Sequence, residues 1–161
     1  MANQPAVSFE FFPPGDDATG RQLWDAVRRL APLQPDFVSV TYGADGSTRT
    51  RTHDCVLRIL RETNLRVAPH LTCVGSSKEE VLGIAQDYWR HGIRHMVALR
   101  GDLPSGAAPE PDLPGFLHAS DLVRGLAGTA PFEISVAAYP EGHPESGGVA
   151  ASASFARRAP G

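Results

Sequence analysis

Short apolar runs alternate along the chain with longer stretches in which apolar residues recur every three or four positions. Five runs have the length and composition of β-strands: about residues 7–12, 36–41, 66–73, 94–100 and 133–139. The stretches between them predict helices over about residues 19–33, 51–62, 77–91 and 119–126. Short strands separated by helices of this length pair in parallel through right-handed crossovers, so the pattern predicts an α/β fold.

The third predicted helix has the clearest local signals. Ser77 is a good N-cap, Glu79 and Glu80 suit the positive first turn, and Gly92 is expected to end the helix. Its apolar stripe comprises Val81, Leu82, Ile84, Ala85, Tyr88 and Trp89. This stripe predicts one face packed against a sheet.

Polar residues stand near the C-terminal end of each predicted strand. They are Glu10, Thr41 and Tyr42, His70, Arg100 to Asp102, and Tyr139 to His143. A (β/α) barrel places its active site at that end of its strands. A Rossmann fold would carry a Gly-rich turn after the first strand, but Phe11-Phe12-Pro13-Pro14 stands there. The predicted fold is therefore of the (β/α)8 TIM-barrel type with about five βα units, incomplete because a closed barrel needs about 250 residues.

The last 16 or so residues differ in composition from the rest of the chain. Small residues dominate residues 146–161, and no sixth strand is visible. They are either an ordinary flexible tail or the out-of-frame end of a truncated or frame-shifted product. We therefore expect a partial barrel over residues 1–145 and a flexible, non-homologous tail over residues 146–161. Unpaired first and fifth strands would favour self-association into a homo-oligomer.

Composition narrows the environment and the partners. The chain has 161 residues, 42% of them hydrophobic and 20% charged, which suits one globular core. Its net charge is −3 and its 15 Lys+Arg residues form no basic block, so we expect no nucleic-acid partner. Residues 1–6 lack the basic and apolar regions of a signal peptide, and no apolar run approaches roughly 20 residues, so we expect a cytoplasmic protein without a membrane partner.

Cysteines and histidines raise the question of a metal. Cys55 and Cys73 lack the paired spacing of a zinc site, which favours reduced structural thiols. Five histidines leave a metal-dependent hydrolase open as an alternative: His53, His70, His95, His118 and His143. No H-x-H or H-E-x-x-H spacing occurs, so we expect no metal.

Six blocks of the sequence resemble, in the same order, methylenetetrahydrofolate reductase of the bacterial type. They are residues 8–14, 37–43, 68–73, 92–95, 98–102 and 137–145. The resemblance covers about residues 5–145, the N-terminal half of that enzyme. It implies an FAD-containing barrel that uses NADH or NADPH to reduce 5,10-methylenetetrahydrofolate to 5-methyltetrahydrofolate, the methyl donor for methionine synthesis in one-carbon metabolism.

Glu10 is the first catalytic residue that the resemblance implies. In this role it would protonate N10 of the folate and help the five-membered ring to open. Phe9 and Phe11 flank Glu10, and we expect burial between them to favour the protonated carboxyl that a general acid requires. The alternative from the residues alone is a carboxylate paired with an arginine across the barrel.

The segment from Arg100 to Asp102 carries the second implied catalytic residue. The resemblance places Asp102 near the flavin and the folate, where its charge would tune the flavin and bind substrate. It implies that Arg100 contacts FAD, and Gly101 would let the backbone approach the ligand. The alternative is a surface ion pair between Arg100 and Asp102.

The resemblance implies further contacts with FAD. The matching positions are Thr41, Tyr42, Ala44, His70, Ala119, Tyr139 and His143, and Thr41 would also bind substrate. Core packing remains the alternative for the two tyrosines, and a hydrogen-bonded barrel histidine for His70. Contacts that the family carries on strands six to eight are missing from this sequence, so we expect weak FAD binding and impaired activity. The alternative is a non-catalytic flavin-binding fragment, or a half barrel completed by another chain.

Overall fold

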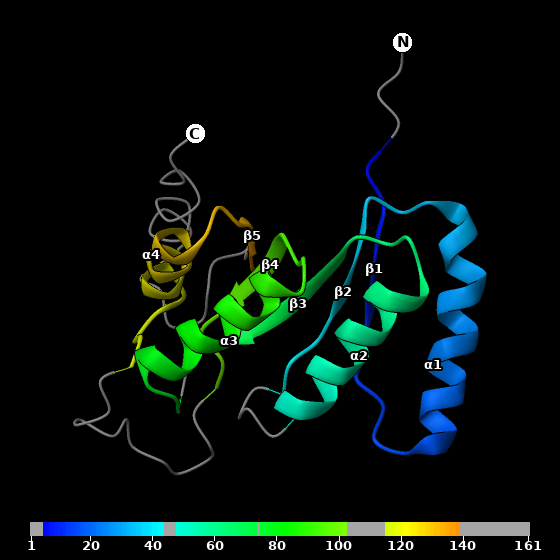
Figure 1. Ribbon diagram of the computed structural model, residues 1–161, viewed down its shortest axis with the longest axis horizontal. Helices are drawn as coiled ribbons and strands as arrows, with labels where there is room; N and C mark the ends of the chain where they lie inside the picture. Colours follow the sequence, from blue (N-terminus) through cyan, green and yellow to red (C-terminus); the bar gives the residue numbers. More distant parts are fainter. Residues whose placement is uncertain (1–4, 44–47, 74, 103–114, 139–161) are drawn as a thin grey trace.

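The computed structural model describes residues 5–43, 48–73, 75–102 and 115–138, in which strands and helices alternate (Figure 1). The strands are β1 (Ser8–Phe11), β2 (Phe37–Val40), β3 (Val67–Thr72), β4 (His95–Leu99) and β5 (Glu133–Val136). The helices are α1 (Asp17–Leu30), α2 (Arg49–Glu62), α3 (Lys78–Arg90) and α4 (Ala119–Thr129), and a 3-10 turn (Ala31–Leu33) follows α1. Each strand and helix predicted from the sequence is present.

The strands form one parallel sheet in the order β1-β2-β3-β4-β5. Each βα unit thus adds its strand beside the previous one, as in a barrel, whereas a doubly wound sheet reverses direction at a switch point. The helices lie along one face of the sheet (Figure 1). The α/β fold is therefore confirmed, and its topology is that of part of a TIM-type barrel. Among the described residues, β1 and β5 form the two edges.

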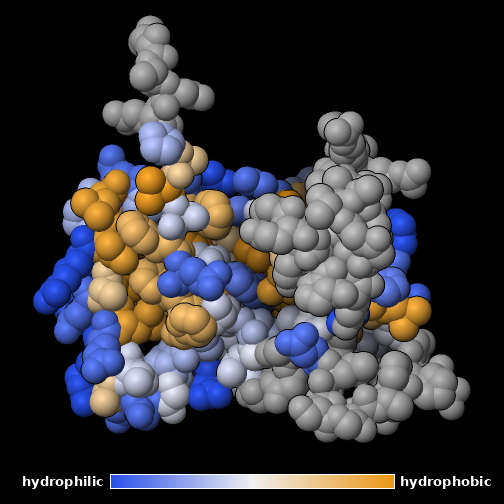
Figure 2. Space-filling view, turned by 180° about the vertical axis from the view of Figure 1, so that it is seen from behind, coloured by the Kyte–Doolittle hydropathy of each residue, from blue (hydrophilic) through white to orange (hydrophobic). Residues whose placement is uncertain are grey.

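Side-chain alternation separates the two faces of the sheet. Phe11 pairs with Val40 and Leu71 with Ala98, and all four are buried in the core that the helices cover. Glu10 pairs with Ser39 on the opposite face. Figure 2 views the molecule from behind and shows apolar and hydrophilic side chains gathered beside one another. One face of the sheet therefore supplies the core that the helices cover, and the other presents polar groups such as Glu10 and Ser39 beside apolar side chains (Figure 2).

The helix ends explain where the elements begin and stop. Ser77 Oγ accepts a hydrogen bond from the Glu80 backbone N–H, and the Glu80 carboxylate accepts one from Ser77 N–H, which completes a capping box. Gly92 has φ +93°, and its N–H donates to the Trp89 carbonyl, so the predicted stop after α3 is confirmed. Asp16 caps α1 in the same way as Ser77 caps α3, so α1 begins two residues before the predicted start.

Two glycines of α4 give a matched test of its packing. A Cβ added at Gly125 would lie 2.5 Å from Phe116 Cζ and 3.2 Å from Leu82 Cδ2, whereas one added at Gly128 would meet nothing within 4 Å. We expect Gly125→Ala to lower the free energy of unfolding by about 1–3 kcal/mol through overpacking. Gly128→Ala should raise it by about 0.5–1 kcal/mol through helix propensity. Urea unfolding of both variants measures the difference, and equal stabilities would contradict the packing of α4 on Phe116.

Both cysteines of the chain lie among the described residues. Cys55 and Cys73 are free and buried, and burial raises the pKa of each thiol to about 11. Both are therefore protonated at neutral pH.

No helix in the described ranges is long and apolar enough to cross a membrane, and no group of three or more potential metal ligands occurs there.

Candidate functional site at the carboxyl edge of the sheet

Parallel pairing brings the C-terminal ends of all five strands to one edge of the sheet. Glu10 lies one residue before the end of β1, Thr41 follows β2, and His70 lies near the end of β3. Arg100 to Asp102 follow β4 directly. The predicted site residues within the described ranges therefore converge at this edge, with Ala119 at the start of α4. Ala44, Tyr139 and His143 lie outside the described residues.

Glu10 forms the centre of a small polar cluster. Its Oε2 lies 3.3 Å from His70 Nε2 and accepts a long hydrogen bond of 3.5 Å from Ser39 Oγ. The Glu10 side chain is 53% exposed, so the expectation that it is buried was wrong. The reason is alternation: Phe9 and Phe11 point to the helix-covered face, so they do not enclose Glu10. Among the described residues, the side chain found beside its carboxylate is the His70 imidazole, where the sequence had left an arginine open as the partner.

His70 is the buried member of this cluster. The residue is 8% exposed, and burial lowers the pKa of its imidazole, although the nearby Glu10 carboxylate raises it in part. His70 is therefore neutral at pH 7. A neutral ring can donate its Nε2–H to Glu10 Oε2, which gives the carboxylate a fixed neighbour without a net positive charge.

Tyr42 and Thr41 point in different directions at the end of β2. Tyr42 is buried in the helix-covered core, and its hydroxyl accepts a hydrogen bond of 2.9 Å from Arg49 Nε. Arg49 also donates to Ser76 Oγ at 2.8 Å, which ties α2 to the segment before α3. The Thr41 carbonyl accepts from Thr52 Oγ1. The Arg49 interactions were missed from the sequence, because nothing local links Arg49 to Ser76.

The segment after β4 is fixed by its backbone. The Arg100 carbonyl accepts hydrogen bonds from the Cys73 N–H at 3.1 Å and from Cys73 Sγ at 3.4 Å. Gly101 has φ +83°, a conformation that favours glycine, and Asp102 is exposed. The turn therefore holds Arg100 beside the end of β3 and leaves the Asp102 carboxylate accessible to a ligand.

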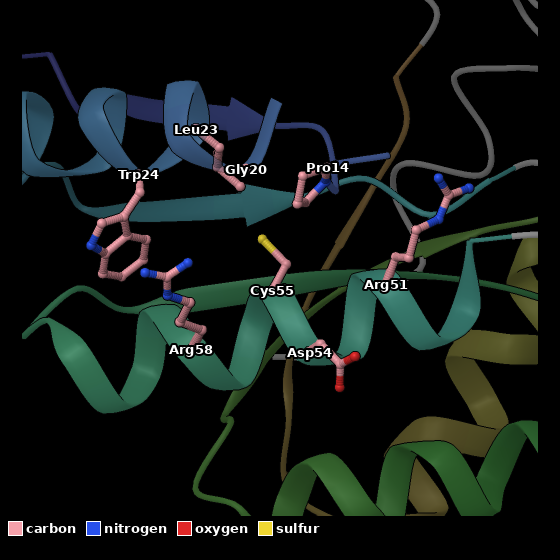
Figure 3. Close-up of a pocket in the computed structure, with 8 residues that line it drawn as sticks. All are labelled: Pro14, Gly20, Leu23, Trp24, Arg51, Asp54, Cys55 and Arg58. Atoms are coloured by element: carbon pink, nitrogen blue, oxygen red, sulfur yellow. The ribbon is translucent and has the colours of Figure 1, made fainter. Parts of the chain in front are cut away.

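A pocket of about 230 Å³ lies elsewhere, between α1 and α2 (Figure 3). The Arg58 guanidinium stacks on the Trp24 ring, 4.0 Å from its centroid, and Cys55 projects from α2 toward α1 (Figure 3). None of the predicted site residues lines this pocket. It is therefore separate from the candidate site, which lies along the strand ends.

Two buried histidines predict a pH dependence of stability. Burial lowers the pKa of His70 and of His95, and the latter leaves its Nδ1 without a hydrogen-bond partner in the described structure. The unfolded chain therefore binds more protons than the folded one once the pH falls below about 6.5. We expect full stability above that pH and progressive loss below it. Urea midpoints at several pH values measure this loss, and His95→Gln should flatten the profile. A profile that is level down to pH 5 in the parent chain would contradict the prediction.

Comparisons with known proteins agree on one family. The family model described as methylenetetrahydrofolate reductase matches residues 1–158. The 5,10-methylenetetrahydrofolate reductases of Salmonella typhimurium and Escherichia coli are 51% and 52% identical to the chain over 147 residues, which are 91% of this chain and 48% of each relative. A relative from Arabidopsis thaliana named methylenetetrahydrofolate reductase (NADH) 1 is 35% identical over 145 residues, 88% of this chain and 24% of the relative. The chain thus spans about half the length of the two bacterial relatives.

Proposed function

The chain belongs to the methylenetetrahydrofolate reductase family, and we propose that it carries the flavin-binding and proton-donating strand ends of an oxidoreductase. In this proposal the reaction reduces 5,10-methylenetetrahydrofolate to 5-methyltetrahydrofolate with NADH or NADPH through FAD. Because the chain spans about half of its bacterial relatives, the proposal assigns it the residues of this edge and not every contact of a full-length enzyme.

The observation that carries the proposal is the pairing of Glu10 with His70 at the carboxyl edge. Their side-chain atoms Oε2 and Nε2 are 3.3 Å apart, although Glu10 lies in β1 and His70 in β3, with α1, β2 and α2 between them in the sequence. A carboxyl group beside a neutral imidazole, open to a ligand on one side, can deliver a proton to a substrate nitrogen. This arrangement supports Glu10 as the general acid toward N10 of the folate.

The side chains at the carboxyl edge have chemistry that fits FAD. Arg100 offers a guanidinium that suits anionic parts of the cofactor, and Thr41 offers a hydroxyl. Gly101 has a positive φ and no side chain, so the backbone is uncovered beside the exposed carboxylate of Asp102. FAD, when bound, supplies the carrier that accepts a hydride from the nicotinamide and passes it to the folate. In our proposal Arg100 and Thr41 bind the cofactor, while Asp102 binds substrate and tunes the flavin by its charge.

A flavin titration tests the proposal directly. The purified chain is titrated with FAD while flavin fluorescence is followed, and NADH or NADPH is then added without oxygen. We expect saturable binding, weaker than that of a full-length relative because fewer groups contact the cofactor. Bleaching of the bound flavin would support the reductase role. Binding without bleaching would leave a flavin-binding fragment, and no binding by the folded chain would overturn the proposal.

A further inference from the structure

The two donors beside Glu10 both approach the same carboxylate oxygen. His70 Nε2 lies 3.3 Å from Oε2, and Ser39 Oγ lies 3.5 Å from the same atom. Ser39 is the direct register partner of Glu10 in β2, whereas His70 comes from β3. Among the described residues, Oε1 of Glu10 has no such neighbour. The carboxyl group is therefore held asymmetrically.

We propose that His70 is a positioning residue that, assisted by Ser39, holds Oε2 of Glu10 and thereby fixes Oε1 as the atom that carries the proton toward the substrate. This inference rests on the proposed function. It differs from the cofactor contact that the family resemblance implies for His70, because here the imidazole acts on Glu10 and through it on the folate.

Burial and sheet register make the donors rigid. Ser39 is 5% exposed and His70 is 8% exposed, whereas the Glu10 side chain is 53% exposed. Ser39 and His70, which are fixed in the sheet, thus orient the Glu10 carboxyl group, which faces outward. A protonated carboxyl has one O–H, and the oxygen that already accepts from an N–H and an O–H is the poorer place for that proton. The proton is therefore directed to Oε1.

The arrangement requires a particular tautomer of His70. The neutral ring must carry its hydrogen on Nε2, since Nε2 is the atom that faces the carboxylate. Long-range proton–nitrogen NMR of the ligand-free chain identifies the tautomer at pH 7.5. We expect the Nε2–H form in the parent chain. The Nδ1–H form would overturn the proposal, whatever the enzymatic activity of the chain.

A titration of the histidine signals tests the pairing a second time. The Glu10 carboxylate raises the pKa of His70, so Glu10→Gln should lower that pKa further. Glu133→Gln is the matched control, because Glu133 lies at the other end of the sheet, where it pairs with Arg66. An equal effect of both substitutions on the His70 titration, or none from Glu10→Gln, would contradict the pairing.

Two substitutions of His70 separate positioning from cofactor binding. His70→Gln retains an amide donor near the place of Nε2, whereas His70→Met fills similar space without one. The rate measured is that at which methylenetetrahydrofolate reoxidises the reduced flavin. We expect His70→Met to slow this rate about tenfold to hundredfold and His70→Gln to restore most of the parent rate. Reduction of the flavin by NADH, a step that does not use Glu10, is measured in both variants, so that an effect of His70 on the cofactor is separated from an effect on Glu10. His95→Gln controls for the loss of a buried histidine.

The possible outcomes keep the two proposals apart. Loss of FAD affinity in His70→Met, with an unchanged reoxidation rate per bound flavin, would overturn the positioning role and leave His70 as a cofactor contact. A parent chain that binds no FAD would overturn the proposed function, and with it the effect on catalysis that positioning by His70 is proposed to have. The tautomer and the His70 titration would then still decide whether the hydrogen-bonded arrangement exists.

Discussion

On the proposed function, replacement of Glu10 by glutamine is expected to slow the reduction of methylenetetrahydrofolate by about 10²–10⁴-fold, the usual contribution of a general acid. Glutamine keeps the size of the side chain and can still accept a hydrogen bond from His70 Nε2, 3.3 Å from the carboxylate in the parent chain. Its amide is too weak an acid to transfer a proton to the folate nitrogen. Anaerobic stopped-flow spectroscopy measures the effect as the rate at which the substrate reoxidises reduced flavin.

The same experiment distinguishes acid catalysis from general damage. NADH should reduce the flavin of Glu10→Gln at the parent rate, since no proton from Glu10 enters that step. Glu133→Gln makes the same chemical change at the start of β5, where the exposed carboxylate pairs with Arg66, and both steps should proceed normally there. Equal slowing of both steps in Glu10→Gln would show that Glu10 acts on flavin binding, and would remove the general-acid role.

The order of strands and helices could be predicted because the local signals agree with the tertiary structure. In α3 the cap at Ser77, the apolar stripe and the stop at Gly92 each indicate the same helix, and the structure has it over Lys78–Arg90. The convergence of the candidate site residues at one edge also followed from topology. Parallel strands share one edge, so polar residues at their ends converge without any need to know the packing.

The environment of individual site residues could not be read in the same way. Glu10 stands between phenylalanines in the sequence, yet its side chain is 53% exposed because neighbours in a strand point to opposite faces. Tyr42 follows the same rule and is buried against α2, where Arg49 binds its hydroxyl. The contact between Glu10 and His70 joins residues 60 positions apart, and only the sheet register brings them together.

Replacement of Leu71 by alanine is expected to give the largest loss of stability, about 2–5 kcal/mol, because it leaves a cavity in the core. Leu71 is fully buried in β3, the central strand, and pairs with Ala98 on the helix-covered face. A domain of this size has a free energy of unfolding of roughly 5–15 kcal/mol, so the variant should retain only part of its resistance to urea. The fluorescence of buried Trp24 reports the transition.

Leu117→Ala is the matched control, since it removes the same atoms from a side chain that is 70% exposed. Its unfolding free energy should stay within about 0.5 kcal/mol of the parent value. The comparison also tests how the two faces of β3 divide their roles, because Leu71 and His70 are neighbours that point to opposite sides. Leu71→Ala should therefore lower stability while the His70 tautomer stays unchanged in the folded protein. A changed tautomer would mean that packing on the helix side also sets the geometry of the candidate site.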